Sequence, residues 1–239
     1  MGYYGYGMYY DPTYILIIIG VILSLLASAN VKGVFARYSN VESDSGLRGR
    51  DVAKKILELN GLYNVEVEHV SGNLTDHYDP ATRTVRLSDA VYNETSIAAL
   101  GVAAHECGHA IQHSKQYAPL GIRSALVPVA NFGATISWPL VLVGLFLNAN
   151  IGKMFILGGV ILFFAAVMFH VVTLPVEFDA SRRALVNLRQ YQLVDNEEVA
   201  MARKVLTAAA LTYVAGTISA LLQFLRLLLI VRSYTDDDE

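Results

Sequence analysis

Four long apolar stretches constrain the fold of this 239-residue chain more than any other feature. They share a near absence of charged residues. They are Tyr14 to Ala29, Ala125 to Leu147, Met154 to Leu174 and Leu206 to Val231. A helix needs about 20 residues of this kind to cross a bilayer. One such stretch alone would fit a buried helix of a soluble core, but four together predict a mainly α membrane protein with about four transmembrane helices.

Charge and cysteine content narrow the classes of function. The formal net charge is -3 and no basic block is present, so we expect no nucleic-acid partner. Cys107 is the only cysteine, which excludes an internal disulfide framework. Residues 1–13 contain no Lys or Arg, which a signal peptide would require, so we expect the first span to be a retained anchor.

The polar residues divide the chain into five expected segments. These are 1–32 (tail and first span), 33–118 (first polar segment), 119–174 (transmembrane hairpin), 175–205 (second polar segment) and 206–239 (fourth span and acidic tail). Segment 33–118 reads as a small α+β unit with a helix over 50–59, strands near 65–70, 75–78 and 84–87, and a long helix over 96–114 capped by Thr95. A further helix is expected over 176–190.

An even number of crossings separates the two polar segments, so both should lie on one face of the membrane. Most lysines and arginines fall in these segments, whereas the other side holds Lys153, Arg232 and an acidic tail. Cytoplasmic loops collect Lys and Arg. We therefore expect a multi-pass protein of the cell membrane with its polar segments in the cytoplasm and both termini outside.

The long helix carries the zinc-binding pattern H-E-x-x-H as His105-Glu106-Cys107-Gly108-His109. Residues four apart share a helix face, so both imidazoles can reach one ion. Glu106 is rotated by about 100° from His105, where it can reach water on that ion without binding the metal. The small residues Ala104 and Gly108 are expected to leave room for the ion and its substrate. The alternative to a zinc site is that His105 and His109 are two surface histidines of an ordinary helix, without a metal.

Catalytic zinc sites use three protein ligands and one open position. His113 continues the spacing but lies about 12 Å from His105 along the helix axis, too far to share the ion. Glu177 is the better third ligand because it follows the third span directly, although a Glu in a first helical turn also suits the helix dipole. The candidates for supporting the ligands are Ser181, Asp179 and His170.

Several stretches together carry a family resemblance. They are HYDP, TRTVRLSDAVY, AALGVAAHECGHAIQH and LPVEFDASRRAL, between His77 and Leu185. In these the chain resembles the neutral zinc metallopeptidases of bacterial membranes, often called YugP-like. The resemblance implies a membrane metallopeptidase with one zinc ion on His105 and His109 and with Glu106 as general base.

More distantly, the layout is similar to CAAX-protease and heat-shock membrane peptidases, in which a later Glu completes the zinc site. In those an Asp commonly follows that Glu by four residues. Ser181 stands there in this chain, so the identity of the supporting residue stays open.

These features together predict an integral-membrane zinc endopeptidase that acts on peptide or membrane-protein segments, with a role in membrane-protein quality control. The alternative is a membrane scaffold or chaperone adaptor with a structural zinc, although such a site should have four ligands. Intramembrane cleavage is disfavoured by the polar stretch from His105 to Lys115. A transporter is disfavoured by spans that are nearly free of charge. The oligomeric state is not indicated.

Overall fold

The computed structural model describes residues 12–147 and 149–236. The Gly- and Tyr-rich start, residues 1–10, and residues 237–239 of the acidic tail lie outside the described residues. Six helices and three strands follow one another along the described chain. They are α1 (Tyr14–Tyr38), α2 (Gly49–Leu59), β1 (Glu66–His69), β2 (His77–Asp79), β3 (Thr84–Leu87), α3 (Ile97–Ser114), α4 (Ala118–Phe146), α5 (Ala149–Gln190) and α6 (Asn196–Asp236).

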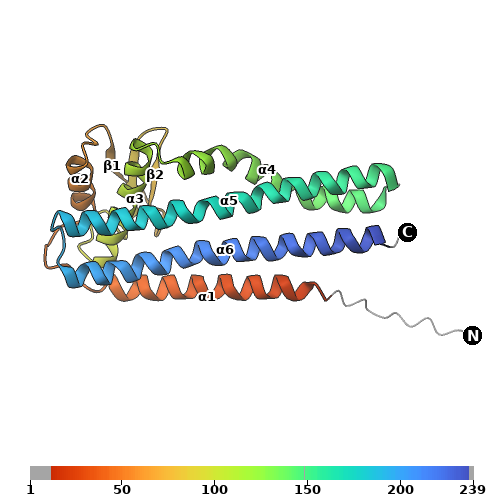
Figure 1. Ribbon diagram of the computed structural model, residues 1–239. Helices are drawn as coiled ribbons and strands as arrows, with labels where there is room; N and C mark the ends of the chain where they lie inside the picture. The colour runs from red at the N-terminus through yellow and green to blue at the C-terminus, as the bar shows by residue number, and fades with distance from the viewer. Residues whose placement is uncertain (1–11, 148, 237–239) are drawn as a thin grey trace, which may run out of the picture.

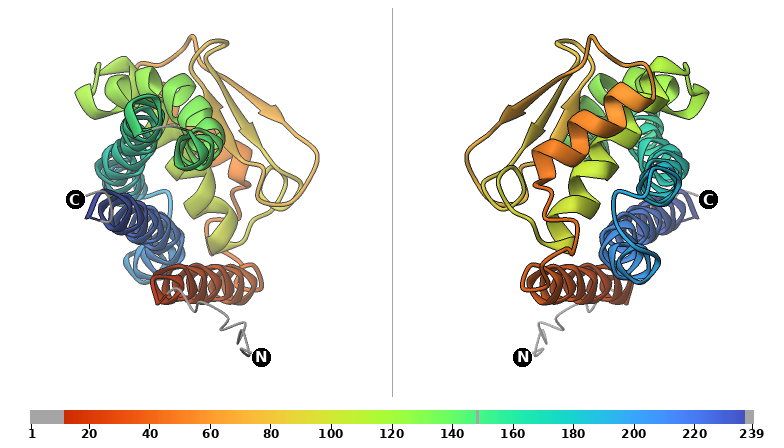
Figure 2. Two further views of the ribbon diagram at one scale, coloured as in Figure 1. Left: turned by 90° about the vertical axis from the view of Figure 1, so that its right-hand side faces the viewer. Right: turned by 90° about the vertical axis from the view of Figure 1, so that its left-hand side faces the viewer.

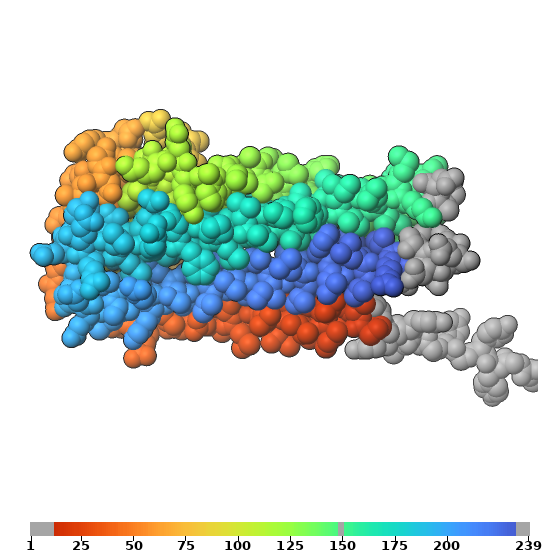
Figure 3. All heavy atoms as spheres, viewed as in Figure 1, coloured from red at the N-terminus to blue at the C-terminus, as the bar shows by residue number. Residues whose placement is uncertain are grey.

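Four of these helices, α1, α4, α5 and α6, are long and apolar enough to cross a membrane. Each is longer than the apolar stretch that predicted it. The 42 residues of α5 extend about 63 Å, twice the roughly 30 Å thickness of a bilayer core. Helices α5, α6 and α1 therefore run side by side beyond the apolar layer and into the polar unit at one end of the bundle (Figures 1 and 3). The expected mainly α membrane fold is confirmed.

The helix expected over 176–190 is not separate, because α5 runs unbroken from the membrane through Pro175. A proline inside a helix removes one backbone hydrogen bond and usually kinks or ends it. Here the helix continues because one side of its outer half is buried. Val176, Ala180, Ala184 and Leu188, spaced by four residues, all have 0% exposure.

The polar unit is the predicted small α+β arrangement. Its sheet has the order β1-β3-β2, with β1 parallel and β2 antiparallel to β3. The expected strands are confirmed to within a few residues. Ser96, and not Thr95, caps α3, because its side chain accepts the backbone N–H of Ala99.

Helix α3 lies between the sheet and the long helices (Figure 2). One hydrophobic core joins it to α2, β3, the outer half of α5 and the start of α6. Ile56, Leu87, Ile97, Leu100 and Leu188 are its largest fully buried side chains. This core fixes the position of α3, and with it the H-E-x-x-H motif, against α5.

Candidate metal centre

The two histidines of the motif lie one turn apart on the face of α3 that meets α5. Their ring centroids are 4.8 Å apart and the rings are nearly perpendicular, at 85°. Both side chains are largely buried, with His105 15% and His109 11% exposed. The helical repeat alone therefore brings two nitrogen ligands to one place.

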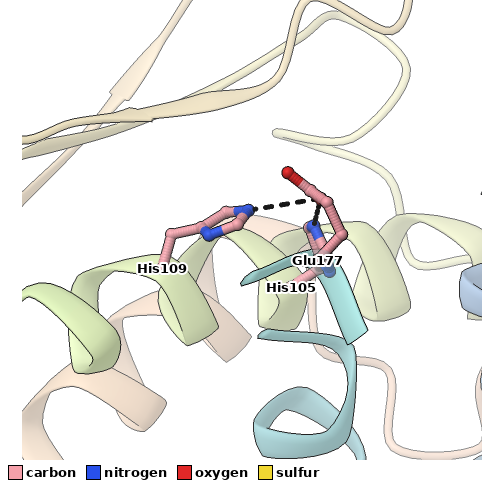
Figure 4. A group of neighbouring side chains, drawn as sticks. All are labelled: His105, His109 and Glu177. Atoms are coloured by element: carbon pink, nitrogen blue, oxygen red, sulfur yellow. Dashed lines mark ion pairs between the residues drawn. The ribbon is translucent and has the colours of Figure 1, made fainter. Parts of the chain in front are cut away.

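Glu177 of α5 completes the cluster (Figure 4). Its Oε2 lies 3.3 Å from Nε2 of His105 and 3.6 Å from Nε2 of His109. Ligand atoms at about 2.0–2.2 Å from a tetrahedral zinc ion are about 3.3–3.6 Å from one another. Both Glu177 distances fall in this range, and the three candidate ligand atoms all lie within 4.8 Å of one another, close to the spacing of a zinc site.

Charge and burial fit a cation as well. Glu177 is 2% exposed, and among the residues that the structure describes its Oε2 has no hydrogen-bond partner. A buried carboxylate oxygen without a partner is costly unless a cation meets it. Burial lowers the pKa of His109, but the carboxylates of Glu177 and Glu106 and the hydrogen bond to Gln112 together outweigh it and raise the pKa of the imidazole above its usual value. A proton and a metal ion compete for the same ring nitrogen of His109, because a histidine binds metal in its neutral form.

Each histidine is oriented through its second ring nitrogen. Nδ1 of His105 lies 3.1 Å from Oγ of Ser181, and Nδ1 of His109 lies 3.0 Å from Oε1 of Gln112. Gln112 is held in turn, because its Nε2 donates to the Val176 carbonyl at 2.7 Å and to Asp179 at 3.0 Å. Partners of this kind fix the tautomer and orientation of metal-binding histidines.

Gly108 allows α3 and α5 to come this close. A Cβ at this position would lie 2.5 Å from the Ala180 carbonyl oxygen. The expectation that Gly108 leaves room for an ion and substrate was therefore wrong. The space is filled by the backbone of α5, next to Ser181 and one turn from Glu177.

A cleft of about 1070 Å³ opens over the cluster. Glu106, 8% exposed, lines it together with both histidines and Glu177. Strand β2, a free edge of the sheet, forms part of one wall through His77 and Tyr78. The membrane-spanning helices add the other wall. Their contributions include Leu120, Arg123 and Val127 from α4 and Tyr213 from α6.

The remaining predicted residues lie farther from the cluster. Asp179 contacts Gln112, Arg182 and Arg183 and reaches His109 only through Gln112. His170 packs beside Gly216 of α6 and is not part of the cluster. The structure thus brings His105, Glu106, His109, Glu177 and Ser181 together, and Asp179 one contact removed.

Sequence reasoning missed three polar residues of the site: Gln112, Arg123 and Tyr213. Gln112 stands three residues after His109 on one helix, a spacing that would have suggested it. Arg123 stands out as a charge at the start of an apolar stretch. No local signal distinguishes Tyr213.

Known proteins resemble this chain over most of its length. Residues 13–232 match the family described as "Putative neutral zinc metallopeptidase". The chain belongs to this family. A similar protein is "Putative membrane protease YugP" of Bacillus subtilis (strain 168). It is 46% identical over 217 residues, which make up 90% of this chain and 95% of that protein. No solved structure matches the chain. As a member of the family, the chain is a zinc metallopeptidase and a multi-pass membrane protein.

Proposed function

We propose that this protein is an integral-membrane zinc endopeptidase in which His105, His109 and Glu177 hold one zinc ion and Glu106 is the general base. The observation that carries the proposal is the spacing of the three ligand atoms beside Glu106 at the floor of an open cleft. Three ligands leave a fourth position free, as in catalytic zinc sites. A structural site, as in the scaffold alternative, would be closed by a fourth ligand.

The zinc ion, Glu106 and the residues that orient the histidines have different roles in peptide-bond hydrolysis. The zinc ion, when bound, supplies a Lewis acid that polarises a carbonyl and lowers the pKa of water. The Glu106 carboxylate takes the proton of the attacking water and passes it to the departing amine. Ser181 and Gln112 keep the imidazoles of His105 and His109 turned toward the ion.

The free edge of β2 offers a place for the substrate backbone. An extended peptide that pairs with β2 would lie in the cleft over the cluster, and its backbone would form the hydrogen bonds that a sheet edge leaves open. The opposite wall comes from α4 and α6, which continue into the membrane. We infer that the substrates are membrane-protein segments next to the bilayer, which suits a role in quality control.

The sidedness follows from the charge distribution. The polar unit and the turn between α5 and α6 lie at one end of the bundle, and the start of α1 and the end of α6 lie at the other (Figure 1). The positive-inside rule puts the lysine- and arginine-rich end in the cytoplasm and both termini outside. Alkaline phosphatase fused to the C-terminus should therefore be active, whereas a fusion in the α5–α6 turn should be inactive. The reverse pattern would invert this topology.

Zinc content and hydrolysis are to be measured on the same detergent-purified proteins. We expect about one zinc per chain in wild type, a large loss in Glu177→Ala, and retained zinc without hydrolysis in Glu106→Gln. Glu58→Gln, which changes an exposed glutamate of α2, is the matched control and should keep both its zinc and its hydrolytic activity.

Three results would contradict the proposal. Wild type without zinc, even after zinc is supplied, would remove the metal centre. Wild-type hydrolysis by Glu106→Gln would show that Glu106 is not the general base. Zinc with no hydrolysis of any soluble or membrane-tethered substrate would favour the scaffold alternative.

A further inference from the structure

Arg123 is the only charged residue of α4, and it lies where this helix passes the metal centre. Its Nη1 is 3.2 Å from Oε1 of Glu177, and its side chain is 29% exposed. A charged residue in a membrane-spanning segment usually has a functional partner. Here the partner is the carboxylate that Figure 4 shows turned toward the two histidines.

The two oxygens of Glu177 have different neighbours. Oε2 faces Nε2 of both histidines, whereas Oε1 faces the Arg123 guanidinium. A carboxylate free to rotate could present either oxygen, or both, to a metal ion. The Arg123 contact fixes one oxygen and thereby directs the other at the site.

This contact completes a pattern around the cluster. Ser181 orients His105 and Gln112 orients His109, but neither touches Glu177. We propose that Arg123 is the positioning residue of the third zinc ligand, so that α4 contributes to the metal centre along with α3 and α5. The inference rests on the proposed zinc site.

The direction in which zinc affinity changes when Arg123 is removed distinguishes a positioning role from a purely electrostatic one. A guanidinium near a zinc ion repels it, so an arginine that acted only through its charge would weaken zinc binding, and its removal would strengthen it. An arginine that positions Glu177 has the opposite effect. Its removal leaves the Glu177 carboxylate, which is 2% exposed, without its charged partner on Oε1, and zinc binding weakens. Loss of such a supporting contact typically lowers metal affinity about 10–100-fold.

The experiment measures the zinc dissociation constant by chelator competition on the full-length protein in detergent. We expect Arg123→Gln to weaken zinc binding about 10–100-fold and Arg123→Lys, which keeps the charge, to weaken it less. Arg203→Gln removes an exposed arginine from α6 and should match wild type. Melting of the zinc-free proteins shows whether each variant is folded.

A second background tests whether Arg123 acts through Glu177. In Glu177→Ala, adding Arg123→Gln should leave zinc affinity unchanged or raise it, because only the repulsion remains to be removed. The same 10–100-fold loss in this background would overturn the inference. So would Arg123→Gln with wild-type or tighter affinity in a wild-type background. Wild type that binds no zinc would instead refute the proposed metal centre itself.

Discussion

Replacing Gly108 with alanine tests the close approach of α3 and α5 on which the metal centre depends. The added Cβ would lie 2.5 Å from the carbonyl oxygen of Ala180 and 3.0 Å from its carbonyl carbon. Both are backbone atoms and cannot rotate away. Ordinary contact begins near 3.4 Å, so α5 must move by roughly 0.9 Å.

The cost follows from two opposing effects. Overpacking of this kind costs about 1–3 kcal/mol, while Gly to Ala inside a helix returns about 0.5–1 kcal/mol. We expect a net loss of about 1–2 kcal/mol, which lowers the melting temperature by about 2–8 °C in a chain of this size. Activity should fall more steeply, about 100-fold, because a displacement near 1 Å moves Glu177 and Ser181 away from the histidines.

Gly101→Ala is the matched control on the same helix. Its added Cβ would meet the Ala202 side chain at 3.5 Å, an ordinary contact. This variant should melt at or above the wild-type temperature and keep its zinc and its activity. Both variants are to be compared with wild type by thermal melting, elemental analysis and peptide hydrolysis. If Gly108→Ala matched Gly101→Ala in all three, the close contact would not set the geometry of the site.

Three further predictions concern single side chains. Ser181→Ala should weaken zinc binding at least about 10-fold in chelator competition, because His105 loses its orienting partner. Cys107 has 0% exposure and burial raises the pKa of its thiol, so N-ethylmaleimide should label it, by mass spectrometry, only after denaturation. The Arg86 guanidinium holds the pKa of Asp79 below its ordinary 3.8. Asp79→Asn should therefore lower the melting temperature at pH 5–7, and this difference should shrink as the pH falls below about 4.

The opposite outcomes are equally measurable. Unchanged zinc affinity in Ser181→Ala would leave His105 oriented by its helix alone. Rapid labelling of Cys107 in the folded protein would mean that the core between α2 and α3 opens readily. A destabilisation in Asp79→Asn that stays constant from pH 7 to pH 3 would show that the Arg86 pair is not the cause.

The sequence predicted the features that depend on short stretches of chain. Membrane spans follow from the length of apolar runs, because a helix must match the thickness of the bilayer. The facing pair His105 and His109 follows from the helical repeat, which places residues four apart on one side. The strands of the polar unit follow from alternation and turn residues, and the structure differs there by a few residues at strand ends and at the cap of α3.

Other features depended on how distant segments pack. Pro175 suggests a new helix in the sequence, yet burial of Val176, Ala180, Ala184 and Leu188 keeps α5 continuous. Gly108 has a clear role only once the backbone of Ala180 lies against it. In both cases a tertiary contact outweighed the local signal.

In the candidate site, too, some relations follow from local sequence and others from tertiary packing. Its two histidines come from one helical turn, so the sequence alone determined their relation. Glu177, Ser181 and Arg123 are from 14 to 76 residues away from them along the chain. Their distances to the histidines were decided by the packing of α3 against α5 and by the path of α4 past that contact, because a few ångströms of helix displacement would separate them.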